Sequence, residues 1–425
     1  MQEPTTLQSA RVERILDALS FFLSDVRYGL GAYLGVYLLT EHAWDQASIG
    51  LALSTGGLAG LLARAPIGLL VDSTQAKRTL LACAALVVTA TCLVIPLAPG
   101  FWPVTAAAVV GALAGTSLSP TLAAISLGVV GPIRFARRAG RNEAVFHFGN
   151  AAVNVVILAA APFAGTAVLF GMMAGTGAAS AMAALALPER AINHATARGL
   201  SPDAATGLRS PAFDGQGRRP APWGPLLKSR PLLVFAGCGA LFHMANASML
   251  SLVAQKLALQ NVGFGISLTA ACAIAAQSVM VPTAALAGAR ADTWGRRPLL
   301  LAAFAALALR GVLYAASDHP AWLIGVQLLD GVGAGLIGAL FPVVVADLVR
   351  GTGHFGAAQG IVGATHALGG IASGTLAGLI VVRAGYNTAF LTLAAIALVG
   401  GALFWLAMPE TRDTPGPNTL HVPLV

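Results

Sequence analysis

Residues 68–78 read GLLVDSTQAKR and residues 288–298 read GARADTWGRRP, and this pair of stretches decides the fold. Both begin with Gly and place Asp four residues later, and they lie 220 residues apart. At the same offset, GALAG at 111–115 matches GVGAG at 331–335. At an offset of 221, LPER at 187–190 is echoed by MPETR at 408–412. The chain is therefore predicted to be a duplicated unit.

The composition of the chain indicates a membrane protein. Of its 425 residues, 56% are hydrophobic and only 10% are charged, and the mean hydropathy is +0.77. Soluble domains carry roughly 25% charged residues. The polar start MQEPTTLQSARVER leads into the first apolar run without a small-residue cleavage site, so we expect no removable signal peptide. These features predict an all-α integral membrane protein.

Apolar runs long enough to span a bilayer occur six times in each copy. Each exceeds the ~18 residues that a spanning helix needs. The first set lies near 15–40, 47–71, 79–98, 102–129, 143–163 and 165–187. The second set lies near 231–254, 264–288, 298–316, 321–346, 355–382 and 387–407. The prediction is twelve transmembrane helices in two pseudo-symmetric six-helix bundles.

The net charge of +8 follows the predicted topology. Of the 25 Lys and Arg residues, 20 fall in the N-terminal segment, in every second loop or in the C-terminal segment, and the opposite loops hold only Lys256 and Arg383. Basic residues concentrate on the cytoplasmic side of membrane proteins. Both termini are therefore expected to be cytoplasmic, in a bacterial inner membrane. Since the charge reports topology, nucleic-acid binding is disfavoured.

The duplication also predicts the domain organisation. Residues 1–187 and 231–412 would form the N-terminal and C-terminal bundles, 188–230 a cytoplasmic linker loop rich in Pro, Gly, Ala and Arg, and 413–425 a cytoplasmic tail. In transporters built from repeats, the substrate binds at the interface of the repeats, near the bilayer midplane.

The two opening stretches resemble the G-x-x-x-D-R-x-G-R-R loop of the major facilitator superfamily. The segments SDVRYGLGAYLGVYL and VADLVRGTGHF resemble uncharacterised bacterial exporters of the superfamily. The resemblance implies that this loop closes the cytoplasmic side. The first copy departs from the pattern at Gln75 and Ala76, and both copies lack the basic residue after Asp. The alternative is that the basic residues only set the topology. The implied gate residues are Asp72, Lys77, Arg78, Asp292, Arg296 and Arg297.

Ionisable and polar residues inside the predicted spans are the candidates for coupling and substrate binding, because such groups are costly in lipid. Asp25 and Tyr28 share one face of the first span, while Arg27 projects roughly 200° away from Asp25. Several other residues form stripes at helical spacing. The full candidate set is Asp25, Arg27, Tyr28, Arg64, His147, Asn150, Asn154, His243, Asn246, Gln327, Asp330, Gln359 and His366.

Two interpretations stay open for the intramembrane aspartates. Asp25 is either a proton-coupling or substrate-contacting carboxylate, or half of a structural ion pair with Arg64, which lies at a matching depth. Asp330 poses the same choice, with Arg310 as its partner. Each histidine either joins helices by hydrogen bonds or couples protons, and His243 is the favoured coupling candidate because the resemblance places its span at the cavity.

The sequence favours neither an enzyme nor a metal site. No G-x-x-x-x-G-K-[ST] loop and no H-E-x-x-H motif occurs, so direct use of ATP and zinc-dependent hydrolysis are not expected. Cys83, Cys92, Cys238 and Cys272 lie inside predicted spans without CxxC spacing. We expect them to be small core residues, with soft-metal or metalloid binding as the alternative. No cofactor is predicted.

The resulting expectation is a monomeric secondary transporter that works by alternating access. We expect proton-coupled efflux of a drug, metabolite or metalloid, from the resemblance around SDVRYGLGAYLGVYL and VADLVRGTGHF. The motifs R-x-x-Q-G and G-x-x-x-G-P-x-x-G-G, usual in drug and proton antiporters of the superfamily, are absent. Direction therefore stays open, and proton-coupled uptake of a polar organic solute is the alternative.

Overall fold

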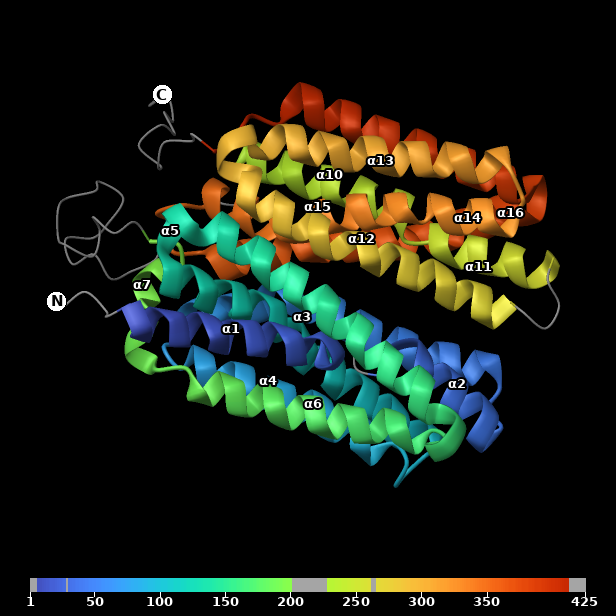
Figure 1. Ribbon diagram of the computed structural model, residues 1–425, viewed down its shortest axis with the longest axis horizontal. Helices are drawn as coiled ribbons and strands as arrows, with labels where there is room; N and C mark the ends of the chain where they lie inside the picture. Colours follow the sequence, from blue (N-terminus) through green and yellow to red (C-terminus); the bar gives the residue numbers. More distant parts are fainter. Residues whose placement is uncertain (1–5, 28–29, 201–227, 261–264, 413–425) are drawn as a thin grey trace. The chain divides into compact units, whose positions relative to one another are not determined.

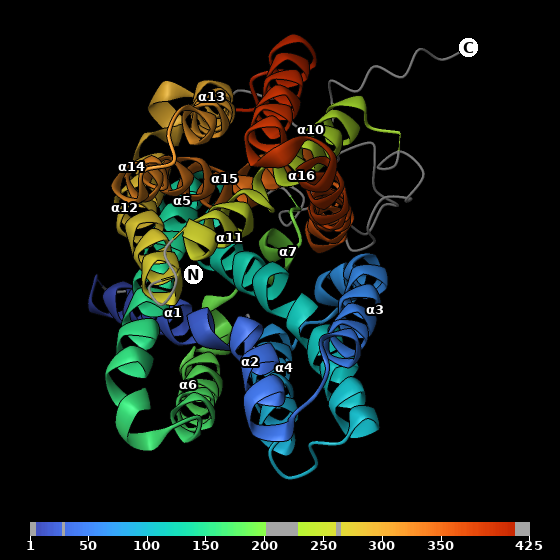
Figure 2. The same ribbon diagram turned by 90° about the vertical axis from the view of Figure 1, so that its right-hand side faces the viewer.

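The computed structural model describes residues 6–27, 30–200, 228–260 and 265–412, and these residues form helices without any β-strand. Figures 1 and 2 show the helices in two views. The predicted residue Tyr28, most of the linker and the tail lie outside the described ranges.

The first copy supplies six long helical elements. The first predicted span is divided into two helices, and Arg27 and Leu30 lie in turns between them. The elements are α1 (Thr6–Val26), α2 (Gly31–His42), α3 (Gln46–Ser73), α4 (Lys77–Val94), α5 (Phe101–Ala164) and α6 (Ala167–Ala186). A short 3-10 turn, η1 (Glu189–Ala191), and α7 (His194–Ala197) follow α6.

The second copy supplies the remaining elements. Its first span is interrupted at residues 247–248 and its fourth at Gln327. The elements are α10 (Arg230–Asn246), α11 (Met249–Gln260), α12 (Gly265–Trp294), α13 (Arg296–Ala316), α14 (Pro320–Val326), α15 (Leu328–Leu348) and α16 (Phe355–Ala407).

The described elements agree with twelve spans. Nine of the helices in the described ranges are long and apolar enough to cross a membrane. Two of them, α5 and α16, each contain two spans joined at a glycine with positive φ, Gly131 (73°) and Gly385 (80°). The pair α1 and α2 covers the remaining predicted span. A residue at such φ is strained unless it is glycine, which explains these tight connections.

The connection between the fourth and fifth spans is itself helical. Directly after Gly131, Pro132 occupies the first turn of the next helix, where its missing N–H costs nothing. The arginines that follow are good helix formers. Residues 132–142, which lie between the predicted spans, therefore extend α5 instead of forming an irregular loop.

The chain divides into two compact units. Unit 1 comprises Met1–Gly131, Val145–Arg198 and His354–Gly360, and unit 2 comprises Pro132–Ala144, Gly199–Gly353 and Ile361–Val425. Each unit thus includes one short segment from the other sequence copy. The domain boundaries at 187 and 230 stay a prediction.

Within each unit, helices pack through small residues. In unit 1, α6 lies along α1 and α4, as Figures 1 and 2 both show. In unit 2, α15 lies along α12 and α13. One close approach in unit 2 is between Gly140 of α5 and Gly288 of α12, where a Cβ on either glycine would lie 2.7 Å or less from the other's Cα. Only glycine permits that contact.

Candidate functional site

Asp25 is a half-buried carboxyl on α1 of unit 1. Its Oδ2 lies 2.7 Å from the hydroxyl Oγ1 of Thr176 on α6. That hydroxyl also lies 2.8 Å from the carbonyl oxygen of Met172, one turn earlier on α6. The suggested ion pair with Arg64 does not form among the described residues, where the Nε of Arg64 is buried without a hydrogen-bond partner. Thr176 was missed by the sequence analysis because hydroxyl partners leave no motif.

Arg27 lies in the turn after α1 and is exposed. Its guanidinium carbon is 4.8 Å from the ring centroid of Phe146, within the range of a cation–π contact. The prediction that Arg27 does not pair with Asp25 agrees with this geometry.

A polar stripe on α5 faces α2 in unit 1. The hydroxyl of Tyr33 donates to Oδ1 of Asn154 at 2.6 Å, and Nδ2 of Asn154 donates to Oδ1 of Asn150 at 3.1 Å. Two members of the predicted α5 stripe are therefore linked to each other. His147, the third member, is buried at 6% exposure.

Arg310 is the centre of a polar cluster in unit 2. Its side chain is 1% exposed and donates to Oδ1 of Asp330 at 2.7 Å. It also donates to Asn246 at 2.6 Å and to Gln327 at 3.0 Å. Gln327 donates to the other carboxylate oxygen of Asp330 at 3.0 Å. The structure thus brings together three predicted residues from α10 and the α14–α15 region around Arg310.

The same cluster includes a tyrosine that the sequence analysis did not identify. Nε of Arg310 donates to the hydroxyl of Tyr314 at 3.2 Å, and this hydroxyl also contacts Gln327. Tyr314 and Arg310 lie one turn apart on α13, so their spacing was the available signal. Both aspartate oxygens and all three guanidinium nitrogens of the cluster have partners.

Two predicted histidines of unit 2 stack on each other. The ring centroids of His243 on α10 and His366 on α16 are 4.6 Å apart, with planes inclined by 36°. Phe341 on α15 packs against His366 with a centroid separation of 5.1 Å. Gln359, two turns before His366, is buried at 4% exposure, and its Nε2 has no hydrogen-bond partner among the described residues.

The first predicted gate loop joins α3 to the start of α16. Oδ1 of Asp72 accepts the backbone N–H of Gly356 at 2.7 Å, and Oδ2 accepts that of Ala357 at 2.8 Å. An anionic group at a helix N-terminus is favourable, because the first N–H groups lack partners inside the helix. A Cβ on Gly68 would come within 2.3 Å of the Gly356 carbonyl oxygen, so the two helices meet backbone to backbone.

The basic residues after Asp72 bind local acceptors. The ammonium of Lys77, which is 0% exposed, donates to the carbonyls of Val71 at 2.5 Å and Thr74 at 2.7 Å. Arg78 pairs with Glu189 of η1 at 2.9 Å. Lys77 therefore closes the α3–α4 turn, and Arg78 ties that turn to the end of α6.

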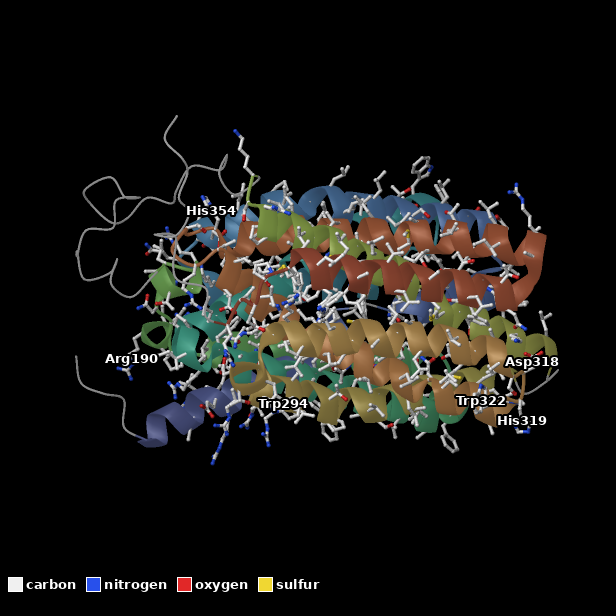
Figure 3. All side chains as sticks on the ribbon, turned by 90° about the horizontal axis from the view of Figure 1, so that it is seen from above. Arg190, Trp294, Asp318, His319, Trp322 and His354 are labelled. Carbon is white, nitrogen blue, oxygen red and sulfur yellow. The ribbon has the colours of Figure 1, made fainter. Side chains whose placement is uncertain are left out.

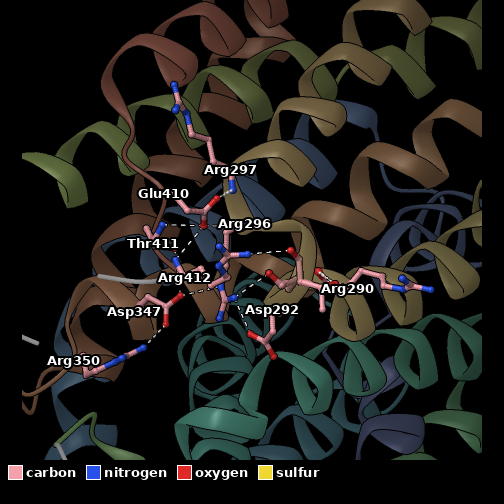
Figure 4. Close-up of polar contacts among 11 residues, drawn as sticks. Arg290, Asp292, Arg296, Arg297, Asp347, Arg350, Glu410, Thr411 and Arg412 are labelled. Carbon is pink, nitrogen blue, oxygen red and sulfur yellow. Dashed lines mark hydrogen bonds and ion pairs between the residues drawn. The ribbon is translucent and has the colours of Figure 1, made fainter. Parts of the chain in front are cut away.

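The second gate loop forms a larger charge network, shown in Figure 4. Arg296 is 5% exposed and pairs with Asp292 at 2.7 Å and with Asp347 at 3.1 Å. Asp347 also pairs with Arg350 at 2.8 Å. Two of the implied gate residues, Asp292 and Arg296, thus pair with each other. Asp347 was not predicted, although it lies in the segment VADLVRGTGHF.

Glu410 holds the start of α13 in this network. Its carboxylate accepts the backbone N–H groups of Arg296 at 2.9 Å and Arg297 at 3.0 Å. Burial works to raise the pKa of Glu410, but backbone hydrogen bonds, from Arg412, Arg296, Arg297 and Thr411, outweigh it and lower the pKa. Glu410 is the counterpart of Glu189 in the repeated LPER and MPETR stretches.

A pocket of about 390 Å³ lies at the far end of unit 2. It is lined by Lys256, Asp318, Tyr386 and Asn387, among others. The ammonium of Lys256 is bound by Asp318 and by Oδ1 of Asn387 at 2.9 Å. Figure 3 shows Asp318 beside His319 and Trp322, while Trp294 lies nearer the opposite end of unit 2.

The described residues contain no group of three or more His, Cys, Asp or Glu side chains that could hold a metal ion. The four cysteines are free thiols, and Cys92, Cys238 and Cys272 are buried while Cys83 is exposed. The three buried thiols agree with the expectation of small core residues, whereas the exposed Cys83 of α4 does not.

Comparison with known proteins finds one family and several related structures. The family model of the Major Facilitator Superfamily matches residues 16–285 and 237–423. Uncharacterized MFS-type transporters from two strains of Mycobacterium tuberculosis are 48% identical over 404 residues, covering 95% of this chain and 94% of theirs.

Two solved structures share the fold at low sequence identity. The proton:xylose symporter XylE, bound to 6-bromo-6-deoxy-D-glucose, is 14% identical with a TM-score of 0.69, covering 95% of this chain and 96% of its own. The human organic anion transporter MFSD10 (TETRAN) is 17% identical with a TM-score of 0.66, covering 95% and 100%. At these identities the likeness shows the fold alone.

Proposed function

This chain belongs to the major facilitator superfamily of membrane transporters, and we propose that it is a proton-coupled secondary transporter that exports a small molecule. The superfamily consists of transporters and not of enzymes. The proposal includes a bacterial inner membrane location with both termini cytoplasmic, a monomeric state and a cycle of alternating access. The charge distribution along the sequence supports the orientation.

The observation that supports proton coupling is the contact between the Thr176 hydroxyl and the carboxyl of Asp25. A hydroxyl has one proton to donate. Its oxygen lies at hydrogen-bond distance from three acceptors, Oδ2 of Asp25 at 2.7 Å and the carbonyls of Met172 at 2.8 Å and Met173 at 3.4 Å. The hydroxyl can donate to an ionised Asp25, or it can donate to the backbone and accept from a protonated Asp25. The contact therefore supports an Asp25 that keeps its partner in both protonation states, as a proton-coupling group requires.

Asp330 provides the contrast within the same protein. Its two oxygens accept from the Arg310 guanidinium and from the Gln327 amide. An arginine partner favours the ionised carboxylate. Asp25 has no such cation among the described residues. The two intramembrane aspartates therefore have opposite environments, and Asp25 is the one suited to gain and lose a proton during transport.

The polar stripe of unit 1 supports a hydrophilic part in the solute. Tyr33, Asn150 and Asn154 offer a hydroxyl and two amides, and Arg27 adds a positive charge. Aromatic rings border them, such as Phe146 under Arg27. This combination suits an organic molecule with acceptor or anionic groups.

The direction of export rests on the sequence resemblance. Uptake by proton symport is the second candidate function, and the same polar stripe favours it.

The test is proton flux in inverted membrane vesicles, followed with a pH-sensitive dye and a panel of drugs, organic anions, sugars and metalloids. Wild type is compared with Asp25→Asn. The matched control is Asp45→Asn, because Asp45 caps α3 by accepting the Ser48 N–H at 2.9 Å and Asn caps equally well. We expect one compound to dissipate the pH gradient in wild-type and control vesicles but not in Asp25→Asn vesicles.

Two results would contradict the proposal. A compound that acts equally on Asp25→Asn vesicles would make Asp25 structural. Flux that appears only in right-side-out vesicles would replace export with uptake and leave the role of Asp25 intact.

A further inference from the structure

The stacked histidines of unit 2 form a paired imidazole site built by three helices. His243 comes from α10 and His366 from α16, with ring centroids 4.6 Å apart. Phe341 of α15 lies 5.1 Å from the His366 ring, and Phe235 of α10 lies 6.5 Å from it. The pair is half-buried, so its imidazoles are only partly withdrawn from solvent.

The backbone of α10 holds the His366 ring against His243. A Cβ on Gly239 would lie 1.8 Å from Nε2 of His366, so only a glycine allows the ring to sit there. Gly239 lies one turn before His243 on the same helix. The hydroxyl of Thr365 lies 3.1 Å from the carbonyl of Ala236 on α10 and 2.7 Å from that of Val362 in its own helix, so this turn of α16 packs against α10. The separation of the two imidazoles is therefore set by packing.

That separation means that the two imidazoles cannot gain protons independently. Each neutral imidazole can accept a proton, but two imidazolium cations at van der Waals distance repel each other strongly in a low-dielectric surrounding. Strongly interacting groups titrate in two separated macroscopic steps that belong to the pair. Between those steps the pair carries a single proton.

Charged groups lie on or against the helices that carry the pair and its aromatic neighbours. Asn246, one turn after His243, accepts from Arg310 of α13, whose charge is balanced by Asp330 at the start of α15. The carboxylate of Glu143 lies against Gly338, one turn before Phe341 on α15. A neutralised ion pair and a carboxylate on or against these helices do not oppose one added positive charge.

We propose that the stacked pair His243–His366 is a second proton-binding site of this transporter and takes up a single proton. This inference rests on the proposed function, in which Asp25 of unit 1 is the first site. One proton site in each unit predicts that two protons move for each solute. The proton binds to an imidazole nitrogen, and no covalent bond between heavy atoms changes.

The first test reads the pair without any solute. The protein is labelled with 15N-histidine, placed in lipid nanodiscs and titrated by NMR, and the signals of its eight histidines are assigned from His→Gln variants. In wild type we expect two steps for the pair, separated by at least one pH unit. In His243→Gln the remaining His366 should titrate once, with the lower step gone. His319→Gln is the control, because His319 is exposed at the start of α14 and its side chain makes no cap hydrogen bond, and it should leave the pair unchanged.

An unchanged His366 titration in His243→Gln would overturn the site. The unaffected signals of the other six histidines show whether each variant is folded, and His366→Gln provides the reciprocal measurement.

The second test connects the pair to transport. With a compound identified in the vesicle assay, the number of protons moved per solute should fall twofold in His366→Gln and stay unchanged in His319→Gln. A ratio that does not fall would overturn the role of the pair in coupling. If no compound in the panel moves protons, the proposed function fails, while the NMR titration still decides whether the pair binds one proton.

Discussion

At the scale of single residues, the cluster around Arg310 depends on one buried ion pair. Arg310 is almost completely buried, and within the described residues Asp330 is its only partner of opposite charge. Breaking a buried ion pair by removing one partner costs about 3–5 kcal/mol, because the other charge stays buried. We expect Asp330→Leu to lower the free energy of unfolding by that amount, measured by denaturant or thermal unfolding in detergent.

The matching double variant, Asp330→Leu with Arg310→Met, should recover most of the lost stability, since both charges leave together. If the double variant is as unstable as the single one, packing and not charge explains the cost.

Glu410 gives a residue-scale prediction for pH. Its pKa in the folded protein lies below the ordinary value of 4.5, because four backbone N–H groups stabilise its charged form. The folded state therefore binds fewer protons than the unfolded state in this window, and the contribution of Glu410 is present above about pH 4.5 and is lost as the pH falls through the lower folded pKa. The melting temperature should fall in acid, and Glu410→Gln should flatten that part of the curve.

Glu189→Gln is the control for that experiment, because Glu189 holds an exposed ion pair with Arg78 and accepts no cluster of backbone N–H groups in the described residues. If the melting temperature falls equally steeply in acid for wild type and Glu410→Gln, Glu410 is not the source of this pH dependence.

The sequence predicts an individual functional residue only when that residue belongs to a recognisable motif. Asp72, Asp292 and Arg296 were found because the repeated loop motif carries them. Thr176 and Tyr33 were missed, because each contacts its partner from a helix that is distant in sequence. The pairing of Asp25 with Arg64 was wrong for a related reason. Matching depth along two helices does not fix which faces meet.

At the scale of elements, the sequence predicts which segments form helices, but it does not predict where a helix is interrupted or continues. All twelve apolar runs were found, since ~18 apolar residues are a strong signal. The breaks near Leu30 and at Gln327, and the continuous helix through 132–142, depend on tertiary packing that a hydropathy pattern does not contain.

The contact between α5 and α12 gives the element-scale prediction. A Cβ on Gly288 would lie 2.7 Å from the Cα of Gly140, so Gly288→Val must push the helices apart. Overpacking of this kind costs about 1–3 kcal/mol. We expect a lower melting temperature in detergent.

Gly237→Ala is the matched control, because it lies within a helix of the same unit and nothing stands within 4 Å of its added Cβ. Alanine is a better helix former than glycine by roughly 0.8–1 kcal/mol, so this control should be neutral or stabilising. Equal melting temperatures for wild type and Gly288→Val would show that the two helices do not depend on this close approach.

At the scale of the whole molecule, the duplication was visible in sequence, yet the way the copies share segments was not. Unit 1 includes residues 354–360 of the second copy, and unit 2 includes residues 132–144 of the first. The bonds from Gly356 and Ala357 to Asp72 are therefore formed within a compact unit although they join the two sequence copies. The spacing of the motif identifies Asp72. Its role as acceptor for the first N–H groups of α16 is visible only in the structure.

Reciprocal exchange of segments predicts that the two sequence copies hold together without a covalent link. When 1–200 and 228–425 are expressed as separate chains, the second should co-purify with an affinity-tagged first chain. Asp72→Leu in the tagged chain removes both bonds to the start of α16 and leaves two backbone N–H groups of that helix without their acceptor, so recovery should fall severalfold. Asp45→Asn, which keeps its helix cap, should leave recovery unchanged. Full recovery with Asp72→Leu would show that apolar packing alone joins the copies, and no recovery with either variant or wild type would show that the linker is required for assembly.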